Sequence, residues 1–182
     1  MDNDADSYRR FLDGDEAAFD ELMASLFRRL VFFIEGYVHD VHTAEDLAMD
    51  AFSDLIVHRH RYNFSVTLKT YLFMIGRSRA LDCLRRRRVI GFTELSALQE
   101  QADEEALEKA VLADERKRAV SAAVAALPED MRTVIHLIYF EEMSYAQAAR
   151  VMKKSVKQVD NLLYRAKKAL RVRLGEEGEQ LI

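Results

Sequence analysis

Residues 144–174 combine helix-capping side chains with a dense group of cations, and that combination is suited to binding nucleic acid. Residues 144–147 and 155–158 each read Ser-x-x-Gln. In such a capping box the serine oxygen accepts a hydrogen bond from the backbone N–H three residues on, and the glutamine reaches back. Only Lys153 and Lys154 separate the first helix from the second box. We therefore expect a helix-turn-helix, whose second helix enters the DNA major groove.

The charge of this segment agrees with DNA binding. Between residues 150 and 173, lysine and arginine far outnumber the acids, of which Asp160 is the one present. A segment this basic, in a chain of formal net charge −4, indicates a surface that binds phosphate. The alternative is a solvated helical hairpin with no ligand.

The second helix of the pair has an apolar face and a polar face. The residues predicted to be buried are Val156, Val159, Leu163, Ala166 and Leu170. Those predicted to point outward are Lys157, Asp160, Asn161, Tyr164 and Lys168, with Gln158 and Arg165 beside them. Asn and Gln can form two hydrogen bonds to adenine and Asp can accept one from cytosine, whereas Arg and Lys suit phosphates. We expect this face to read base edges; the alternative is that Asp160 and Asn161 are merely solvated.

A second pattern is acidic. Asp46, Asp50 and Asp54 recur every four residues in a segment with helical periodicity. This spacing puts like charges on one helix face, at a cost of about 0.2–0.5 kcal/mol for each pair. Met49 lies between them and is expected to be exposed. Such a face is typical of a docking surface for a basic partner; the alternative is an incidental solvated face.

Residues 69–88 mix cations with aromatic residues, which suits single-stranded or melted DNA, where exposed bases can stack. The aromatic residues of this region are Phe64, Tyr71 and Phe73, of which Phe73 could equally belong to the core. The cations are Lys69, Arg77, Arg79, Arg85, Arg86, Arg87 and Arg88. The four consecutive arginines favour contact with phosphates over an ordinary solvated helix end.

Signatures of enzymes, metal sites and exported proteins are missing from the sequence. There is no glycine-rich phosphate loop, and the 5 histidines and 1 cysteine lack the spacing of metal ligands. A lone Cys83 excludes an internal disulfide and fits a reducing cytoplasm. Neither an export signal nor an apolar run of membrane-spanning length is present. We expect no cofactor, no metal, no membrane insertion and a cytoplasmic location.

Hydrophobic periodicity predicts an all-α protein made of two small helical domains. We expect an N-terminal domain over residues 7–88, with a helix capped by Thr43 and an aperiodic loop near residues 60–68. An acidic, aperiodic linker over residues 89–102 should follow. The C-terminal domain should occupy residues 103–175, with one helix from Asp103 to Ala126, another beginning at Pro128, and then the helix-turn-helix. Residues 176–182 form an acidic tail.

These segments, in this order, resemble the sigma-70 family, and in particular the small two-domain sigma factors of the extracytoplasmic-function group. The resemblance covers about residues 8–174. Residues 44–52 resemble the helix that binds core RNA polymerase, and residues 70–86 resemble the segment that melts and reads the −10 element. Residues 126–132 and 143–149 resemble the C-terminal domain, whose form is winged-helix-like. Residues 159–167 resemble its −35-reading helix.

The resemblance implies a promoter-specificity subunit of bacterial RNA polymerase, which is not an enzyme. Its partners would be core polymerase, through the β′ clamp helices and the β flap, promoter DNA, and an anti-sigma factor. The core-binding residues would be Asp46, Met49, Asp50 and Phe52. The −10 residues would be Phe64, Lys69, Tyr71, Arg77, Ser78, Arg79, Arg85, Arg86, Arg87 and Arg88. The −35 residues would be Lys154, Ser155, Lys157, Gln158, Asp160, Asn161, Arg165 and Lys168.

The sequence departs from the family pattern at three positions. Tyr71 replaces a common tryptophan, Met49 a common glutamine, and Ser78 an asparagine that often lines the pocket for a flipped −10 base. The −10 base preference therefore does not transfer. Two rival functions are a stand-alone helix-turn-helix repressor, which leaves the acidic face unexplained, and an enzyme with an appended DNA-binding domain, which lacks a catalytic constellation.

Overall fold

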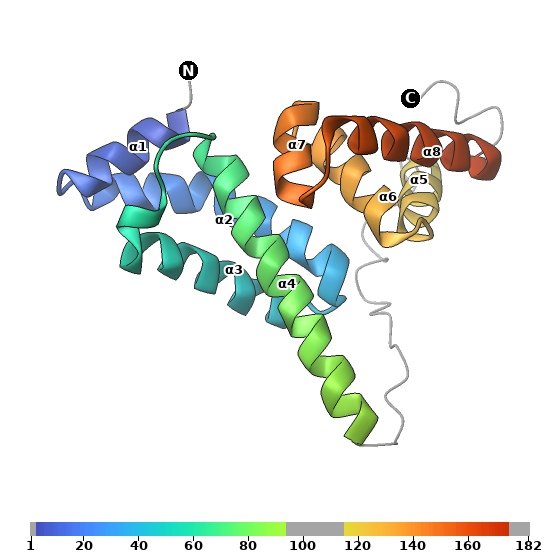
Figure 1. Ribbon diagram of the computed structural model, residues 1–182, viewed down its shortest axis with the longest axis horizontal. Coiled ribbons are helices and arrows are strands. Elements are labelled where there is room, and N and C mark those ends of the chain that lie inside the picture. The colour runs from blue at the N-terminus through green and yellow to red at the C-terminus, as the bar shows by residue number, and fades with distance from the viewer. Residues whose placement is uncertain (1–2, 94–114, 175–182) are drawn as a thin grey trace. The chain divides into compact units, whose positions relative to one another are not determined.

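The computed structural model describes residues 3–93 and 115–174, and all regular structure within them is helical, as the sequence predicts. The chain divides into two compact units, separated between α4 and α5 (Figure 1). The first unit holds α1 (Asn3–Leu12), α2 (Ala17–Val38), α3 (Val41–Val57), the short 3₁₀ turn η1 (Arg59–Arg61) and α4 (Leu68–Thr93). The second holds α5 (Glu115–Ala125), α6 (Glu129–Ile135), the π-helical turn η3 (His136–Phe140), most of α7 (Tyr145–Met152) and α8 (Val156–Leu174).

Helix α2 is the centre of the first unit, because α1, α3 and α4 all pack against it. Its apolar residues recur at helical spacing, and Leu22, Leu26, Leu30, Ile34 and Tyr37 are buried. Phe73 of α4 is also fully buried, with its ring centroid 4.9 Å from that of Phe33 on α2. Phe73 is therefore a core residue and not a platform for DNA bases.

Helices α2 and α4 approach closely at Gly76. A Cβ atom at this position would lie 2.8 Å from Leu30 Cδ1 and 3.2 Å from Ile34 Cδ1. Both neighbours are fully buried and have little room to move. The absence of a side chain at Gly76 therefore lets α4 lie close to α2, and this fixes the line along which α4 crosses the unit.

Helix α1 begins at Asn3, four residues before the predicted start of the N-terminal domain at residue 7, because its first turn is already anchored. Ala5 is buried, and Ser25 Oγ donates to Asp4 at 3.0 Å. One turn later the buried Tyr8 hydroxyl donates to the Leu55 carbonyl at 2.8 Å. This contact joins α1 to the end of α3.

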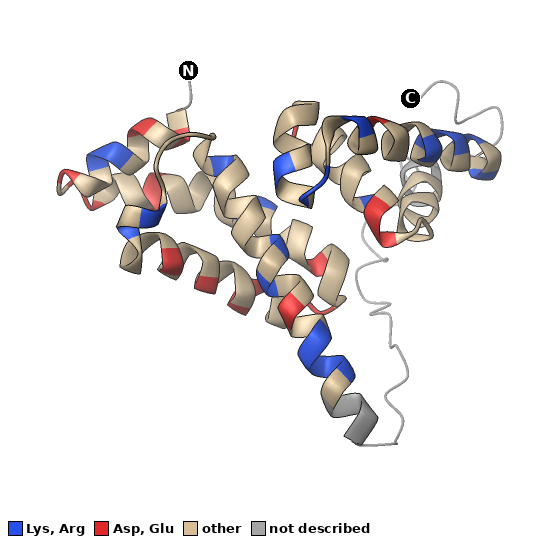
Figure 2. Ribbon diagram, in the orientation of Figure 1, with Lys and Arg blue, Asp and Glu red and all other residues tan. Residues whose placement is uncertain are grey.

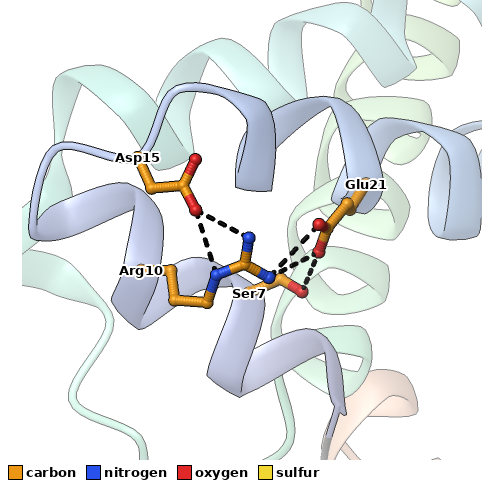
Figure 3. Close-up of polar contacts among 4 residues, drawn as sticks. All are labelled: Ser7, Arg10, Asp15 and Glu21. Atoms are coloured by element: carbon orange, nitrogen blue, oxygen red, sulfur yellow. Dashed lines mark hydrogen bonds and ion pairs between the residues drawn. The ribbon is translucent and has the colours of Figure 1, made fainter.

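Arg10 fastens the end of α1 to the start of α2 (Figure 3). Its guanidinium contacts Asp15 at 2.6 Å and Glu21 at 2.9 Å, and Ser7 Oγ donates to the same Glu21 carboxylate at 2.9 Å. Hydrogen bonds from Arg10 hold the pKa of the Asp15 and Glu21 carboxyls below their ordinary values, and Ser7 adds to the effect at Glu21. The same hydrogen bonds raise the pKa of Arg10.

Two helix starts in the first unit differ from the prediction. Asp40, and not Thr43, caps α3, because the Asp40 carboxylate accepts from the Thr43 N–H at 2.7 Å. A hydrogen bond from the Thr43 side chain, together with this one from its backbone, lowers the pKa of the Asp40 carboxyl. At the start of α4, the Thr67 hydroxyl accepts from the Thr70 N–H at 3.2 Å. Helix α4 therefore begins at Leu68, where the predicted aperiodic loop near residues 60–68 ends.

Residues 89–93, which we predicted as part of the linker, continue α4 to Thr93. Arginine is a good helix former, so the run of arginines before them favours continuing the helix. The remaining linker residues, 94–102, and the predicted start of α5 at Asp103 lie outside the described residues.

The two capping boxes of the second unit are confirmed. Ser144 and Gln147 exchange hydrogen bonds of 2.8 and 3.3 Å at the start of α7. Ser155 and Gln158 exchange bonds of 2.8 and 3.2 Å at the start of α8. Lys153, in the turn between the helices, has a positive φ of 54°, the left-handed conformation that commonly ends a helix.

Helix α8 packs on α5 and α6 through one apolar face. Val159, Leu163, Ala166 and Leu170 are buried as predicted. The prediction that Val156 is buried is wrong. Val156 lies in the first turn of α8 and is 49% exposed. Periodicity gives the direction of a residue around the helix, but not how far along the helix the neighbouring elements extend.

Candidate nucleic-acid and protein interfaces

The outer face of α8 presents the polar residues predicted to read DNA. All of them are exposed in the structure: Lys157, Gln158, Asp160, Asn161, Arg165 and Lys168. Tyr164 shares this face and is 68% exposed. The helical spacing predicts that Tyr164 points outward, but Tyr164 is not among the residues expected to bind the −35 element. An aromatic ring and hydrogen-bonding side chains on one exposed face can contact both the apolar and the polar edges of bases.

Two residues predicted for the same surface also make contacts within the fold. Lys154 is half-buried, and its ammonium lies 3.0 Å from the Asp130 carboxylate at the start of α6. The Ser155 hydroxyl accepts a hydrogen bond in the capping box. Lys154 thus ties the turn before α8 to the start of α6, and Ser155 caps α8 itself.

On α3, Asp46, Met49, Asp50 and Val57 form an exposed face, which we call the α3 face. Figure 2 shows acidic residues recurring along this helix. Asp46 and Asp50 are exposed, Met49 is 48% exposed and Val57 is 71% exposed. Val57, eleven residues after Asp46, continues the same face and was missed in the sequence. Phe52 is only 1% exposed, so it can support the helix from below but cannot itself contact a partner.

The third aspartate, Asp54, is paired within the chain. Arg79 of α4 donates to Asp50 at 3.1 Å and forms a short ion pair with Asp54. His58 Nδ1 lies 3.3 Å from the other Asp54 oxygen. The like-charge repulsion expected along α3 is thus offset by a cation from the neighbouring helix.

The arginines of α4 differ in what they contact. Arg77 Nε donates to the Tyr37 hydroxyl at 3.2 Å, and Arg85 pairs with Asp82 at 2.8 Å. Arg87 donates to the Val38 carbonyl at 3.1 Å and to Thr43 Oγ1 at 2.9 Å, which ties α4 to the junction of α2 and α3.

The other α4 residues predicted to bind the −10 element differ in their exposure to solvent. Arg86 and Arg88 are exposed and have no polar contact within the described parts of the chain. They are the α4 arginines best placed to bind phosphate. Lys69 and Ser78 are half-buried.

An aromatic cluster lies beside the start of α4. The centroid of the buried Tyr62 ring lies 4.6 Å from that of Phe64 and 5.0 Å from that of Tyr71. Phe64 is 37% exposed and has a positive φ of 59°, which is unusual for a bulky residue. The Arg9 guanidinium of α1 lies 4.7 Å from its ring centroid. Burial raises the pKa of Tyr71, which is half-buried. Phe64 and Tyr71 therefore offer partly exposed rings next to a cation.

The structure also bears on two other kinds of site. Within residues 3–93 and 115–174, no group of three or more His, Cys, Asp or Glu side chains is arranged to hold a metal ion. Among the same residues, no helix combines the length and apolar character needed to span a membrane.

Comparison with known families gives two matches. The family model for sigma-70 region 2 matches residues 9–89, and the model for sigma-70 region 4 matches residues 117–170. The first match contains the α3 face and α4. The second contains α7 and all of α8 up to Leu170.

Individual relatives agree with these matches. RNA polymerase sigma-H factor of Pseudomonas aeruginosa is 30% identical, with 93% of each chain covered. ECF RNA polymerase sigma factor SigM of Bacillus subtilis is 26% identical, covering 84% of this chain and 92% of SigM. The fold is also similar to that of sigma factor RpoE, solved in complex with the anti-sigma factor NepR from Bartonella quintana. That match has a TM-score of 0.68 and 22% identity, and covers 87% of this chain and 97% of RpoE.

Proposed function

The chain belongs to the sigma-70 family, in its extracytoplasmic-function group, and on that premise we propose that it directs core RNA polymerase to promoters by binding a melted −10 element and a duplex −35 element. At the level of the family, it is an RNA polymerase sigma factor that acts in transcription initiation and is not an enzyme. The proposal concerns which surface binds which partner.

The observation that carries the proposal is that a single chain presents an exposed acidic face on α3 and an exposed polar and basic face on α8, on separate units. A stand-alone repressor needs only the second face. The α3 face, with exposed Asp46 and Asp50 around Met49, is complementary to a basic helical partner, for which we propose the β′ clamp helices. We propose the β flap as the partner of the second unit, by analogy with the family alone.

For the −35 element, α8 would lie in the major groove. Gln158, Asp160 and Asn161 are exposed near its N-terminal end, which is the end that contacts base edges in helix-turn-helix proteins. Arg165 and Lys168, further along, would contact phosphates and set the register without reading sequence.

For the −10 element, melted bases would stack near Phe64 and Tyr71 while the cations of α4 bind the backbone. Capture of a flipped base offsets an unstacking cost of a few kcal/mol. Arg86 and Arg88 are the exposed arginines in position to contact phosphates. We also expect regulation by an anti-sigma factor, since RpoE, of similar fold, was solved with one.

The docking surface is tested by reversing one charge on it. Asp46 is exposed and has no ion pair in the described residues, so Asp46→Lys should leave the fold intact while placing a cation against a basic partner. We expect binding to core polymerase to weaken at least tenfold, because a like-charge contact replaces an attractive one. Titration of core polymerase with labelled protein measures this.

The matched control is Asp20→Lys, which reverses an exposed charge of the first unit on α2. It should bind core polymerase like the unchanged protein. Equal affinity of Asp46→Lys and Asp20→Lys would remove the α3 face from the proposal.

A further inference from the structure

Arg79 is held between the two acidic residues at the edge of the α3 face. One guanidinium nitrogen contacts Asp50 at 3.1 Å and the other pairs with Asp54. The third nitrogen, Nε, is buried and has no hydrogen-bond partner. A guanidinium binds phosphate through these same N–H groups. In this arrangement both terminal nitrogens donate to carboxylates, Nε is closed to solvent, and only the second N–H of each terminal nitrogen is left for another acceptor.

Helix spacing does not by itself separate Arg79 from the outer side of α4. Residues seven apart lie almost on one line along a helix. Arg79 shares its line with the fully buried Leu72 and with the exposed Arg86. The contacts with Asp50 and Asp54 are what place the Arg79 side chain against α3.

The pairing leaves the three aspartates of α3 with different charges open to a partner. Asp54 and Arg79 each have a side chain 29% exposed, so this pair is partly shielded from water. The Asp50 side chain is 59% exposed and shares only one hydrogen bond with Arg79. Asp46 has no intramolecular cation in the described residues. An incoming cation therefore meets a full charge at Asp46, a shared charge at Asp50 and a neutralised one at Asp54.

We propose that Arg79 is a positioning residue of the docking face, which neutralises Asp54 and competes with a basic partner for Asp50. It is not a contact for −10 DNA, contrary to the expectation from sequence. The inference rests on the proposed binding of core polymerase to the α3 face. Arg79 sets the strength of that binding below what three aspartates alone would give.

The test is Arg79→Gln, which removes the charge and keeps a long polar side chain. Binding to core polymerase should become roughly 3- to 10-fold tighter at low salt, because one internal competitor for the aspartates is gone. The gain should shrink as salt screens the charges. Arg79→Lys retains the cation and should bind like the unchanged protein. Arg28→Gln removes an exposed arginine of α2 that has no ion pair in the described residues, and it is the control.

A second measurement distinguishes the DNA-contact role. With core polymerase saturating, promoter binding by Arg79→Gln should equal that of the unchanged protein, whereas Arg88→Gln should weaken it. Unchanged or weaker binding of Arg79→Gln to core polymerase would overturn the inference, and so would a loss of promoter affinity equal to that of Arg88→Gln.

Folding is followed by thermal unfolding of each variant. If Arg79→Gln does not fold, Asp54→Asn replaces it. Without the Asp54 charge, Arg79 pairs with Asp50 alone, so binding to core polymerase should weaken several-fold; unchanged binding would contradict the inference. If the unchanged protein does not bind core polymerase at all, the proposed function fails. If it binds and Arg79→Gln binds identically, only the role of Arg79 fails.

Discussion

At the scale of single residues, base reading and phosphate binding on α8 should separate. Asn161 and Lys168 are both exposed on the outer face, two turns apart. An amide that forms two hydrogen bonds to one base contributes about 1–3 kcal/mol of discrimination at that position. A lysine on a phosphate contributes affinity that is the same for all sequences and depends on salt.

Asn161→Ala should therefore relax the preference for one base pair of the −35 element and weaken the preferred site by about 1–3 kcal/mol. Lys168→Ala should weaken all sites alike and lower the salt slope by about one. Competition binding of a −35 library to the assembled polymerase measures both. If Asn161→Ala weakened every site uniformly, Asn161 would be a phosphate contact and not a reader of bases.

The Arg10 contacts predict how stability depends on pH. The pKa values of Asp15 and Glu21 are lowered in the fold, chiefly by hydrogen bonds from Arg10. Their contribution is therefore complete above the pKa values of the unfolded chain, and it is lost as pH falls through the lower folded values. Both groups are exposed, so the effect is small and decreases with salt.

Arg10→Met should accordingly be less stable than the unchanged protein at neutral pH, and the two should converge as pH falls through the lowered pKa values of Asp15 and Glu21. Urea unfolding across the acid range measures this convergence. Arg28→Met removes an exposed arginine without an ion pair in the described residues and should run parallel to the unchanged protein. A constant offset for Arg10→Met at all pH values would show that the carboxylates are not involved.

At the scale of elements, the crossing of α2 and α4 depends on one glycine. A Cβ on Gly76 would meet Leu30 at 2.8 Å, whereas a Cβ on Gly36 of α2 would meet no atom within 4 Å. Gly76→Ala should cost about 1 kcal/mol or more, because a packed core must shift. Gly36→Ala should stabilise by up to about 1 kcal/mol through helix propensity. Urea unfolding followed by circular dichroism compares them, and equal stabilisation by both would contradict the close crossing.

The elements themselves were largely predictable because their signals are local. Each capping box needs residues only three apart, and the apolar stripe of α2 repeats within one helix. The errors have local causes as well. Asp40 and Thr43 are both good caps, and Asp40 prevails because its side chain reaches the N–H three residues on. Val156 fits the periodicity of α8 but lies in its exposed first turn.

The contacts of the site residues were not predictable, because they join distant parts of the sequence. Arg79 pairs with residues 25 and 29 positions away, and Arg87 contacts Thr43 across 44. A list of cations cannot show which of them are already paired within the fold. The sequence therefore indicated a basic helix, and only the structure separates Arg86 and Arg88 from the arginines that hold helices together.

At the scale of the whole molecule, the chain combines two surfaces for which we propose different partners. The α3 face belongs to one unit and the outer face of α8 to the other. A single helix-turn-helix contacts a short half-site, and such proteins usually gain affinity by forming dimers. We expect this chain to gain it by binding core polymerase, which joins the −10 and −35 contacts in one complex. Its affinity for duplex DNA alone should accordingly be low and strongly dependent on salt.

The central claim is tested most directly by transcription in vitro. Core polymerase is mixed with the purified protein and a pool of upstream fragments from the source genome, and the 5′ ends of the transcripts are mapped. The account predicts discrete start sites that require the protein and share −10 and −35 sequences. These sites should be lost with Asp46→Lys and retained with Asp20→Lys. Tight binding to duplex DNA by the protein alone, without association with core polymerase and without specific starts, would contradict it.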